Sequence, residues 1–246
     1  MLFTQEDKFI LLQIARSSLE RIIAGKLERQ FPPISQNIKS QHGAFVTLRE
    51  EGQLRGCIGF IDAKKPLYQV IREAAVKAAK EDPRFYPVTT IELNKINIEI
   101  SILSELVPLA SIEEIEIGKH GLLIISGTVR GLLLPGVAVE MNWNREQFLS
   151  NVAMKAGLSA DAWKEPETKL FSFTTETFRE NGQFRTVILC RQNIFVRMLL
   201  QECFIPTTPL FSPQKLMLSL IRPPLLKFQE AYLHSFHLTQ DICIPV

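Results

Sequence analysis

The sequence predicts an α+β fold in which mostly antiparallel sheet is flanked by helices. Residues 96–102 alternate between isoleucine and polar residues, the pattern of an antiparallel strand with one solvated face. Residues 43–60 have the pattern of a β-hairpin, with a Gly-containing turn between two strand-like runs. Strands and helices do not alternate regularly, which argues against a parallel α/β sheet.

The first helix is expected to begin after Thr4 and to end at Gly25. Thr4 and Asp7 have the spacing of a capping box, and apolar residues then recur at near-helical intervals over residues 11–23. Glycine at the end of such a run is a typical C-terminal stop. This segment is therefore predicted to pack one face on the sheet.

Two further helices are expected later in the chain. One starts near Pro66, which suits a first helical turn, and ends at Asp82, because a residue before proline is disfavoured in the α region. The other is capped by Asn144 and stopped at Gly157. Additional strands are predicted at residues 122–125, 136–139 and 169–174.

The most informative segment is the heptapeptide of residues 54–60, Leu-Arg-Gly-Cys-Ile-Gly-Phe. Glycine in a strand usually indicates close approach of another backbone, a helix or a ligand, and here Gly56 and Gly59 flank Cys57. Alternation predicts that Leu54, Gly56, Ile58 and Phe60 face the core. It places Arg55, Cys57 and Gly59 on the opposite face.

Cys57 has two interpretations. If Glu51 and Gly52 form the turn, Cys57 lies opposite Val46 and shares its face with Ala44, Val46 and Leu48. As an unpaired cysteine it can be a small buried hydrophobe. Alternatively, Arg55 on the same face would favour the thiolate and make Cys57 a nucleophile.

Three other residues are candidates for a site. His120 lies in a loop between Gly118 and Gly121 and is a base, a ligand or a plain turn residue. Arg84 follows an Asp-Pro pair, where its guanidinium can bind a carboxylate or phosphate. Glu140 ends an apolar run near Trp143, so it is either partly hidden from water with a raised pKa or a solvated strand end.

Several segments of the chain occur in a characteristic order. They are Leu-Arg-Gly-Cys-Ile-Gly at 54–59, Asp-Pro-Arg-Phe at 82–85, Gly-Lys-His-Gly-Leu at 118–122, the apolar run at 132–140, and Lys-Ala-Gly-Leu at 155–158 with Asp-Ala-Trp at 161–163. Together they resemble the AMMECR domain family, named for the AMME syndrome candidate gene, over about residues 4–180. Its prokaryotic members are known as protein A of the AmmeMemoRadiSam system.

The resemblance implies a fold of two closely packed subdomains over residues 4–182, and it implies Memo-like and radical-SAM proteins as partners. The chain departs from the family pattern at Phe60, Gly136 and Ala153, where members commonly have a small hydroxyl residue, glutamine and cysteine. Cys57 is thus the sole thiol of this region.

Composition excludes several classes. A net charge of +2 over 246 residues does not suggest a nucleic-acid-binding face. The N-terminus lacks a signal-peptide pattern, no apolar run is long enough to span a membrane, and the four cysteines form no zinc-like spacing. No metal site is predicted, no phosphate-binding glycine fingerprint is present, and a reducing cytoplasm fits best.

Residues 183–246 differ in composition from the rest of the chain. They have few charges, three of the four cysteines and a proline-rich stretch. They match nothing in the family, so they are expected to be a poorly packed extension or a membrane-surface or partner helix.

Two functions remain open at this point. The first is a non-catalytic accessory or binding module. The second is a cysteine-dependent enzyme, with Cys57 as nucleophile or thiol carrier, Glu140 and His120 as further catalytic candidates, and Arg55, Gly56, Gly59 and Arg84 as binding residues of a small cleft.

Overall fold

The computed structural model describes residues 3–27, 29–31, 35–62 and 64–180, all within one compact unit. They form two antiparallel sheets with helices, so the predicted α+β class is confirmed. The extension predicted for residues 183–246 lies outside the described residues.

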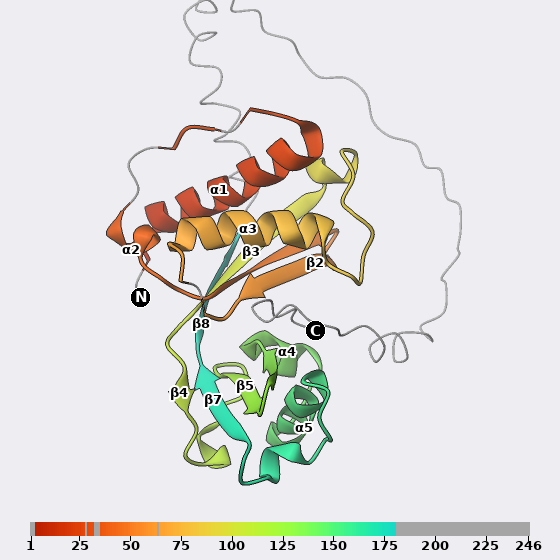
Figure 1. Cartoon of the computed structure of the whole chain (residues 1–246). Helices are drawn as coiled ribbons and strands as arrows, with labels where there is room; N and C mark the ends of the chain where they lie inside the picture. Colours follow the sequence, from red (N-terminus) through yellow and green to blue (C-terminus); the bar gives the residue numbers. More distant parts are fainter. Residues whose placement is uncertain (1–2, 28, 32–34, 63, 181–246) are drawn as a thin grey trace, which may run out of the picture. The chain divides into compact units, whose positions relative to one another are not determined.

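The first sheet has the strand order β2-β1-β3-β8, with every neighbouring pair antiparallel (Figure 1). Its strands are β1 (Ala44–Glu50), β2 (Gln53–Phe60), β3 (Ile96–Leu103) and β8 (Thr175–Arg179). The helices packed with it are α1 (Gln5–Ala24), α2 (Gln36–Lys39), α3 (Leu67–Lys80) and the 3-10 helix Glu92–Asn94.

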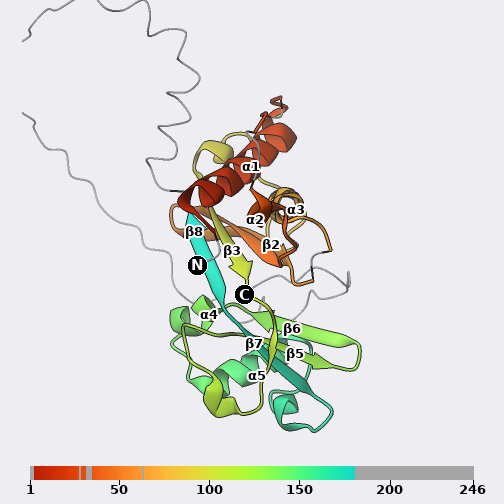
Figure 2. The ribbon, with the colours of Figure 1, turned by 90° about the vertical axis from the view of Figure 1, so that its left-hand side faces the viewer.

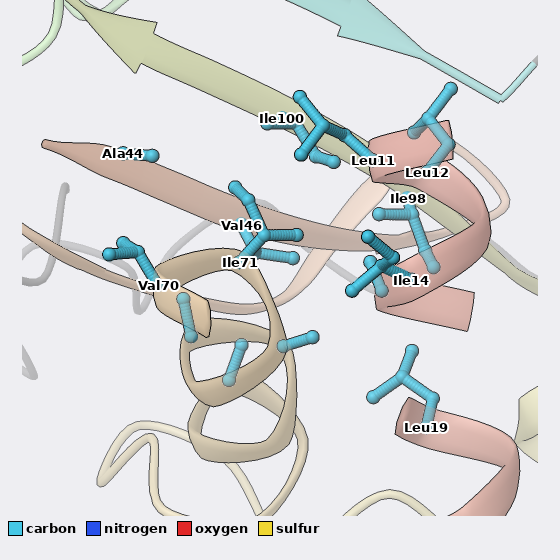
Figure 3. Close-up of a cluster of buried hydrophobic side chains, with 14 of the residues drawn as sticks. Leu11, Leu12, Ile14, Leu19, Ala44, Val46, Val70, Ile71, Ile98 and Ile100 are labelled. Atoms are coloured by element: carbon cyan, nitrogen blue, oxygen red, sulfur yellow. The ribbon is translucent and has the colours of Figure 1, made fainter. Parts of the chain in front are cut away.

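The core of this half lies between the sheet and the two long helices. Figure 3 shows Leu11, Ile14 and Leu19 of α1 and Val70 and Ile71 of α3 in one cluster with strand residues such as Val46, Ile98 and Ile100. The inward isoleucines of β3 predicted from alternation are all buried. Burial of this apolar surface, at about 25 cal/mol per Å², is the main term that stabilises the half.

The second sheet has the order β4-β7-β5-β6 and is also antiparallel. Its strands are β4 (Val107–Pro108), β5 (Gly121–Ser126), β6 (Val129–Leu133) and β7 (Lys169–Phe173). The helices of this half are α4 (Pro135–Glu140), α5 (Arg145–Lys155) and the 3-10 helices Ile112–Glu114 and Ala162–Lys164. Phe148, Leu149 and Val152 of α5 are buried in its core.

The second sheet is inserted between β3 and β8 of the first. The chain leaves β3 for β4 and returns from β7 to β8, and the two connections are hydrogen-bonded to each other. Ser104 N donates to Thr174 O, and Thr174 N donates to Ser104 Oγ, both at 2.9 Å. A third apolar cluster contains Phe45 and Cys57 together with Phe173 and other residues of the second sheet.

The predicted boundaries of α1 are confirmed, whereas α3 and α5 end one or two residues before the predicted Asp82 and Gly157. Thr4 and Asp7 form the capping box of α1, and Gly25 ends it with a φ of 65°, in the left-handed region that glycine adopts without strain. Asn144 caps α5 in the same reciprocal way with Gln147.

The strand predicted at residues 136–139 is wrong, because this segment belongs to helix α4. Pro135 occupies the first turn after the extended residue Leu134, where its missing N–H costs nothing. The continuous apolar run thus contains a short, half-buried helix and not a strand.

The predicted hairpin register is also wrong. Cys57 lies opposite Thr47, and the register shifts between Leu48 and Arg49, so that Arg55 is the extra residue of a bulge. The bulge changes which face its neighbours occupy. Leu54 packs against the cluster that contains Cys57, contrary to the simple alternation.

Candidate functional site

Cys57 is a buried thiol, 2% exposed, in the middle of β2. Its Sγ lies 3.0 Å from Oγ1 of Thr47 on the neighbouring strand. Burial raises the pKa of Cys57 to about 12, against weaker opposing effects of the Thr47 hydrogen bond and the charges of Arg84 and Lys155. The thiol is therefore protonated at neutral pH.

The backbone of Cys57 faces away from β1 and is bound by side chains. Its N–H donates to Oδ2 of Asp82 at 2.8 Å, and its carbonyl lies 3.4 Å from Nη2 of Arg84. Asp82 follows α3, and its carboxylate is almost fully buried. Asp82 and Arg84 thus occupy the outer edge of β2 at Cys57, where a further strand would otherwise pair.

Asp82 holds Arg84 in a two-pronged ion pair. Nε of Arg84 donates to Oδ1 at 3.0 Å and Nη2 donates to Oδ2 at 2.8 Å, while the Arg84 backbone N–H donates to Oδ1 at 3.1 Å. Such bidentate pairs are strong and fix the direction of the guanidinium. The Arg84 fork is directed toward the protein's own carboxylate.

Arg55 and Arg84 meet at one aromatic ring. The guanidinium carbons lie 5.9 Å and 5.5 Å from the centre of the Phe85 ring, within the range of cation–π attraction. Arg55 Nε also donates to Oε1 of Glu92 at 2.8 Å. This hydrogen bond from Arg55 is the main cause that lowers the pKa of Glu92 to about 2.

The structure therefore brings the two predicted arginines together, but each is paired with a different carboxylate. Burial raises the Cys57 pKa, and the charges that most oppose this rise are those of Arg84 and Lys155, so the action of Arg55 on the thiolate stays a prediction. A common ligand of the two arginines stays a prediction.

The two glycines beside Cys57 have packing reasons. A Cβ on Gly56 would lie 2.2 Å from the carbonyl oxygen of Ala78 in α3. One on Gly59 would lie 2.3 Å from the Phe45 ring. The close approach predicted for this segment is confirmed, and a helix and a neighbouring strand account for it.

Glu140 ends α4, and its side chain is 65% exposed. Its carboxylate lies 3.4 Å from Nη2 of Arg49, a solvent-exposed pair that contributes little to stability. The alternative of a carboxylate hidden beside Trp143 is therefore wrong, and the solvated alternative holds.

His120 is half-buried and binds its own loop. The backbone N–H of Glu116 donates to Nδ1 at 3.2 Å, and the same nitrogen lies 3.1 Å from the Glu114 carbonyl. These contacts fit the turn-residue interpretation. Neither His120 nor Glu140 forms a hydrogen bond or ion pair with Cys57.

Sequence reasoning missed Asp82, Thr47 and Glu92 as members of the site. The available signal for Asp82 was the Asp-Pro-Arg order, since aspartate commonly accepts from the backbone two residues later. The position of Thr47 opposite Cys57 could be predicted only from the correct hairpin register, which the bulge changes. Glu92 depended on a loop whose path the sequence did not predict.

Over the described ranges, no cluster of three or more His, Cys, Asp or Glu side chains has the arrangement of a metal site. The helices within the same ranges include none that is long and apolar enough to cross a membrane.

The comparison with known families decides the relationship of this chain. The family model described as AMMECR1 matches residues 12–178. The chain belongs to the AMMECR1 family. It is 41% identical over 187 residues to a protein of Methanothermobacter thermautotrophicus, covering 73% of this chain and 97% of that protein.

A protein of Methanocaldococcus jannaschii is 39% identical over 189 residues, covering 73% of this chain and 92% of the relative. The fold is similar to the crystal structure of an uncharacterized protein from Pyrococcus horikoshii, with a TM-score of 0.70 and 33% identity. That match covers 74% of this chain and 95% of the solved one. None of these descriptions assigns an activity.

Proposed function

We propose that this AMMECR1-family chain is an accessory binding module that recognises a protein partner through the loop of residues 82–91. One observation carries the proposal. Tyr86 and Ile91 on this loop are 90% and 81% exposed, although the loop that bears them is tightly held. Exposed apolar side chains on a rigid support are typical of protein–protein contact sites.

The loop is held at several points along its length. Val88 N donates to the Ala79 carbonyl at 2.8 Å, and Thr89 N donates to Oε2 of Glu92 at 2.8 Å. The Asp82–Arg84 ion pair fixes its start. A pre-organised loop loses little conformational entropy on binding, which leaves more of the contact energy for affinity.

The expected partner is a protein with an apolar pocket that accepts the tyrosine. The family resemblance implies Memo-like and radical-SAM proteins as the first partners to test, and a cytoplasmic location is part of the same proposal. Tyrosine is enriched among the residues that dominate binding energy, because it buries a large apolar ring and keeps a polar tip.

The alternative is a cysteine-dependent enzyme using Cys57. It is favoured by the charges of Arg84 and Lys155, which act to lower the Cys57 pKa. Desolvation outweighs them, so the nucleophile would have to be formed from a buried, protonated thiol. The binding module is therefore the better supported of the two.

The test is calorimetric titration of the full chain with a purified Memo-like protein and, separately, with a purified radical-SAM protein. Tyr86→Ala and Ile91→Ala are each expected to weaken binding at least about tenfold. Met154→Ala removes an exposed apolar side chain on α5 and serves as the control with unchanged affinity. Absence of binding to both proteins, or equal affinity of all three variants, would contradict the proposal.

A further inference from the structure

The outer edge of β8 is a second surface, separate from the loop of residues 82–91. β8 is the last strand of the first sheet, and among the described strands it pairs only with β3 (Figure 2). Thr177 and Arg179 are exposed and Thr175 is half-buried. Such an edge presents unpaired backbone groups in a row, which makes it a template for another strand.

The hydrogen-bonding pattern between β3 and β8 determines which backbone groups of β8 face away from the sheet. Glu180 N donates to Ile98 O at 2.9 Å, so residues 176, 178 and 180 direct their backbone groups toward β3. Thr175, Thr177 and Arg179 must then direct theirs away from the sheet. Among the described residues, none forms a hydrogen bond with these outward groups.

We propose that β8 pairs with β8 of a second copy of this chain, antiparallel and symmetric about Thr177. The strands would join two first sheets into one continuous sheet. In this register each outward residue of one copy faces an outward residue of the other, so six backbone hydrogen bonds form. An isologous contact of this kind closes as a two-fold dimer.

The side chains around β8 suit this symmetric pairing. Thr177 faces Thr177 of the second copy, a favourable cross-strand pair, and Arg179 faces Thr175, so that no like charges stand opposite each other. On the other face Glu176 stands opposite Phe178 of the second copy. Lys8 already lies 2.7 Å from Glu176 and 5.9 Å above the Phe178 ring.

Lys8 therefore places a positive charge near Glu176 of the other copy across the two-fold axis. Because Lys8 of the second copy lies over its own Phe178, it comes within reach of Glu176 of the first copy. Each lysine then has a glutamate on both strands. The contact is small, so the dimer is expected to be weak, with a dissociation constant on the order of 100 µM.

The first test is sedimentation of the full chain under reducing conditions, from about 10 µM to about 1 mM, a range that spans the expected constant. The mass is expected to rise from monomer to dimer. Thr177→Pro removes an outward N–H that the sheet does not use and should abolish the rise, whereas Thr177→Val keeps the N–H and should retain it. A monomer throughout, or a Thr177→Pro chain that associates like the native one, would overturn the proposal.

The second test uses the unmodified chain and does not depend on how the proline variant folds. Amide hydrogen exchange of the peptide covering residues 175–179 is followed across the same concentrations. Three outward amides should exchange fast in dilute protein and become protected as the concentration rises. Exchange that does not change with concentration would overturn the pairing.

Discussion

The two edges of the first sheet differ in what binds their outward backbone groups. At β2, the outward backbone groups of Cys57 are bound by the Asp82 carboxylate and the Arg84 guanidinium. At β8, the outward groups of Thr175, Thr177 and Arg179 face no described residue. The first sheet therefore has one edge that side chains close at Cys57 and, among the described residues, one edge whose outward backbone groups have no partner.

The difference shows what closing an edge requires. A buried carboxylate is costly unless charged and neutral donors surround it, and Asp82 receives four hydrogen bonds, three of them from Arg84. The closed edge thus depends on a buried ion pair, whereas the open edge relies on exposure. The Arg84 side chain, which was expected to bind a ligand near Cys57, is therefore already bound by the protein's own Asp82 carboxylate.

The largest expected effect comes from opening the β2 edge. Asp82→Ala leaves the Arg84 guanidinium without its carboxylate and the Cys57 N–H without an acceptor. The free energy of unfolding should fall by about 3–5 kcal/mol in urea titrations. Asp82→Asn keeps an acceptor and should lose less, while Glu81→Gln, in an exposed pair with Lys77, should change little. Equal stability of Asp82→Ala and the native chain would refute the closed-edge description.

A smaller effect is expected from Gly56→Ala. The new Cβ meets the Ala78 carbonyl of α3, four residues before Asp82, so the helix must move and the ion pair with it. Overpacking of this kind costs about 1–3 kcal/mol. Gly136→Ala is the matched control, because nothing lies within 4 Å of its Cβ and alanine favours a helix. Thermal unfolding should separate the two, and indistinguishable melting temperatures would argue against the close approach of α3.

The smallest effect concerns Glu92→Gln. The pKa of Glu92 is lowered to about 2 by Arg55 and Thr89, so its charge stabilises the fold fully above about pH 4.5, and this contribution is lost as pH falls toward 2. The partly exposed pair should contribute about 0.5–1 kcal/mol at pH 7. The difference in unfolding free energy between native and variant chains should shrink in acid. A difference that grows as pH falls would contradict this sign.

The parts of the fold that the sequence predicted have local causes. The capping box at Thr4, the N-cap at Asn144 and the stop at Gly25 depend on residues within a few positions of each other, and all three are found. Likewise, the alternation of isoleucine with polar residues along β3 follows directly from the burial of one face of the strand. Short-range chemistry was sufficient for these elements.

Most of the errors came from features that depend on distant contacts. At the bulge, the Arg55 side chain contacts Phe85 and Glu92, which lie 30 and 37 positions later in the chain. Helix α4 was mistaken for a strand because its apolar run has no clear period. The site residue Asp82 was recognised only as a helix end, since its acceptor role requires the backbone of β2 beside it.

The most direct test of the account is the reactivity of Cys57 toward iodoacetamide, mapped by mass spectrometry of its peptide. A buried thiol with a pKa raised to about 12 should stay unmodified in the native chain under conditions that fully modify the urea-unfolded chain. Cys57→Ala should also leave partner binding unchanged. Native-state modification at the rate of an unfolded thiol, with a midpoint below its ordinary value, would contradict the closed edge and favour the cysteine-dependent enzyme.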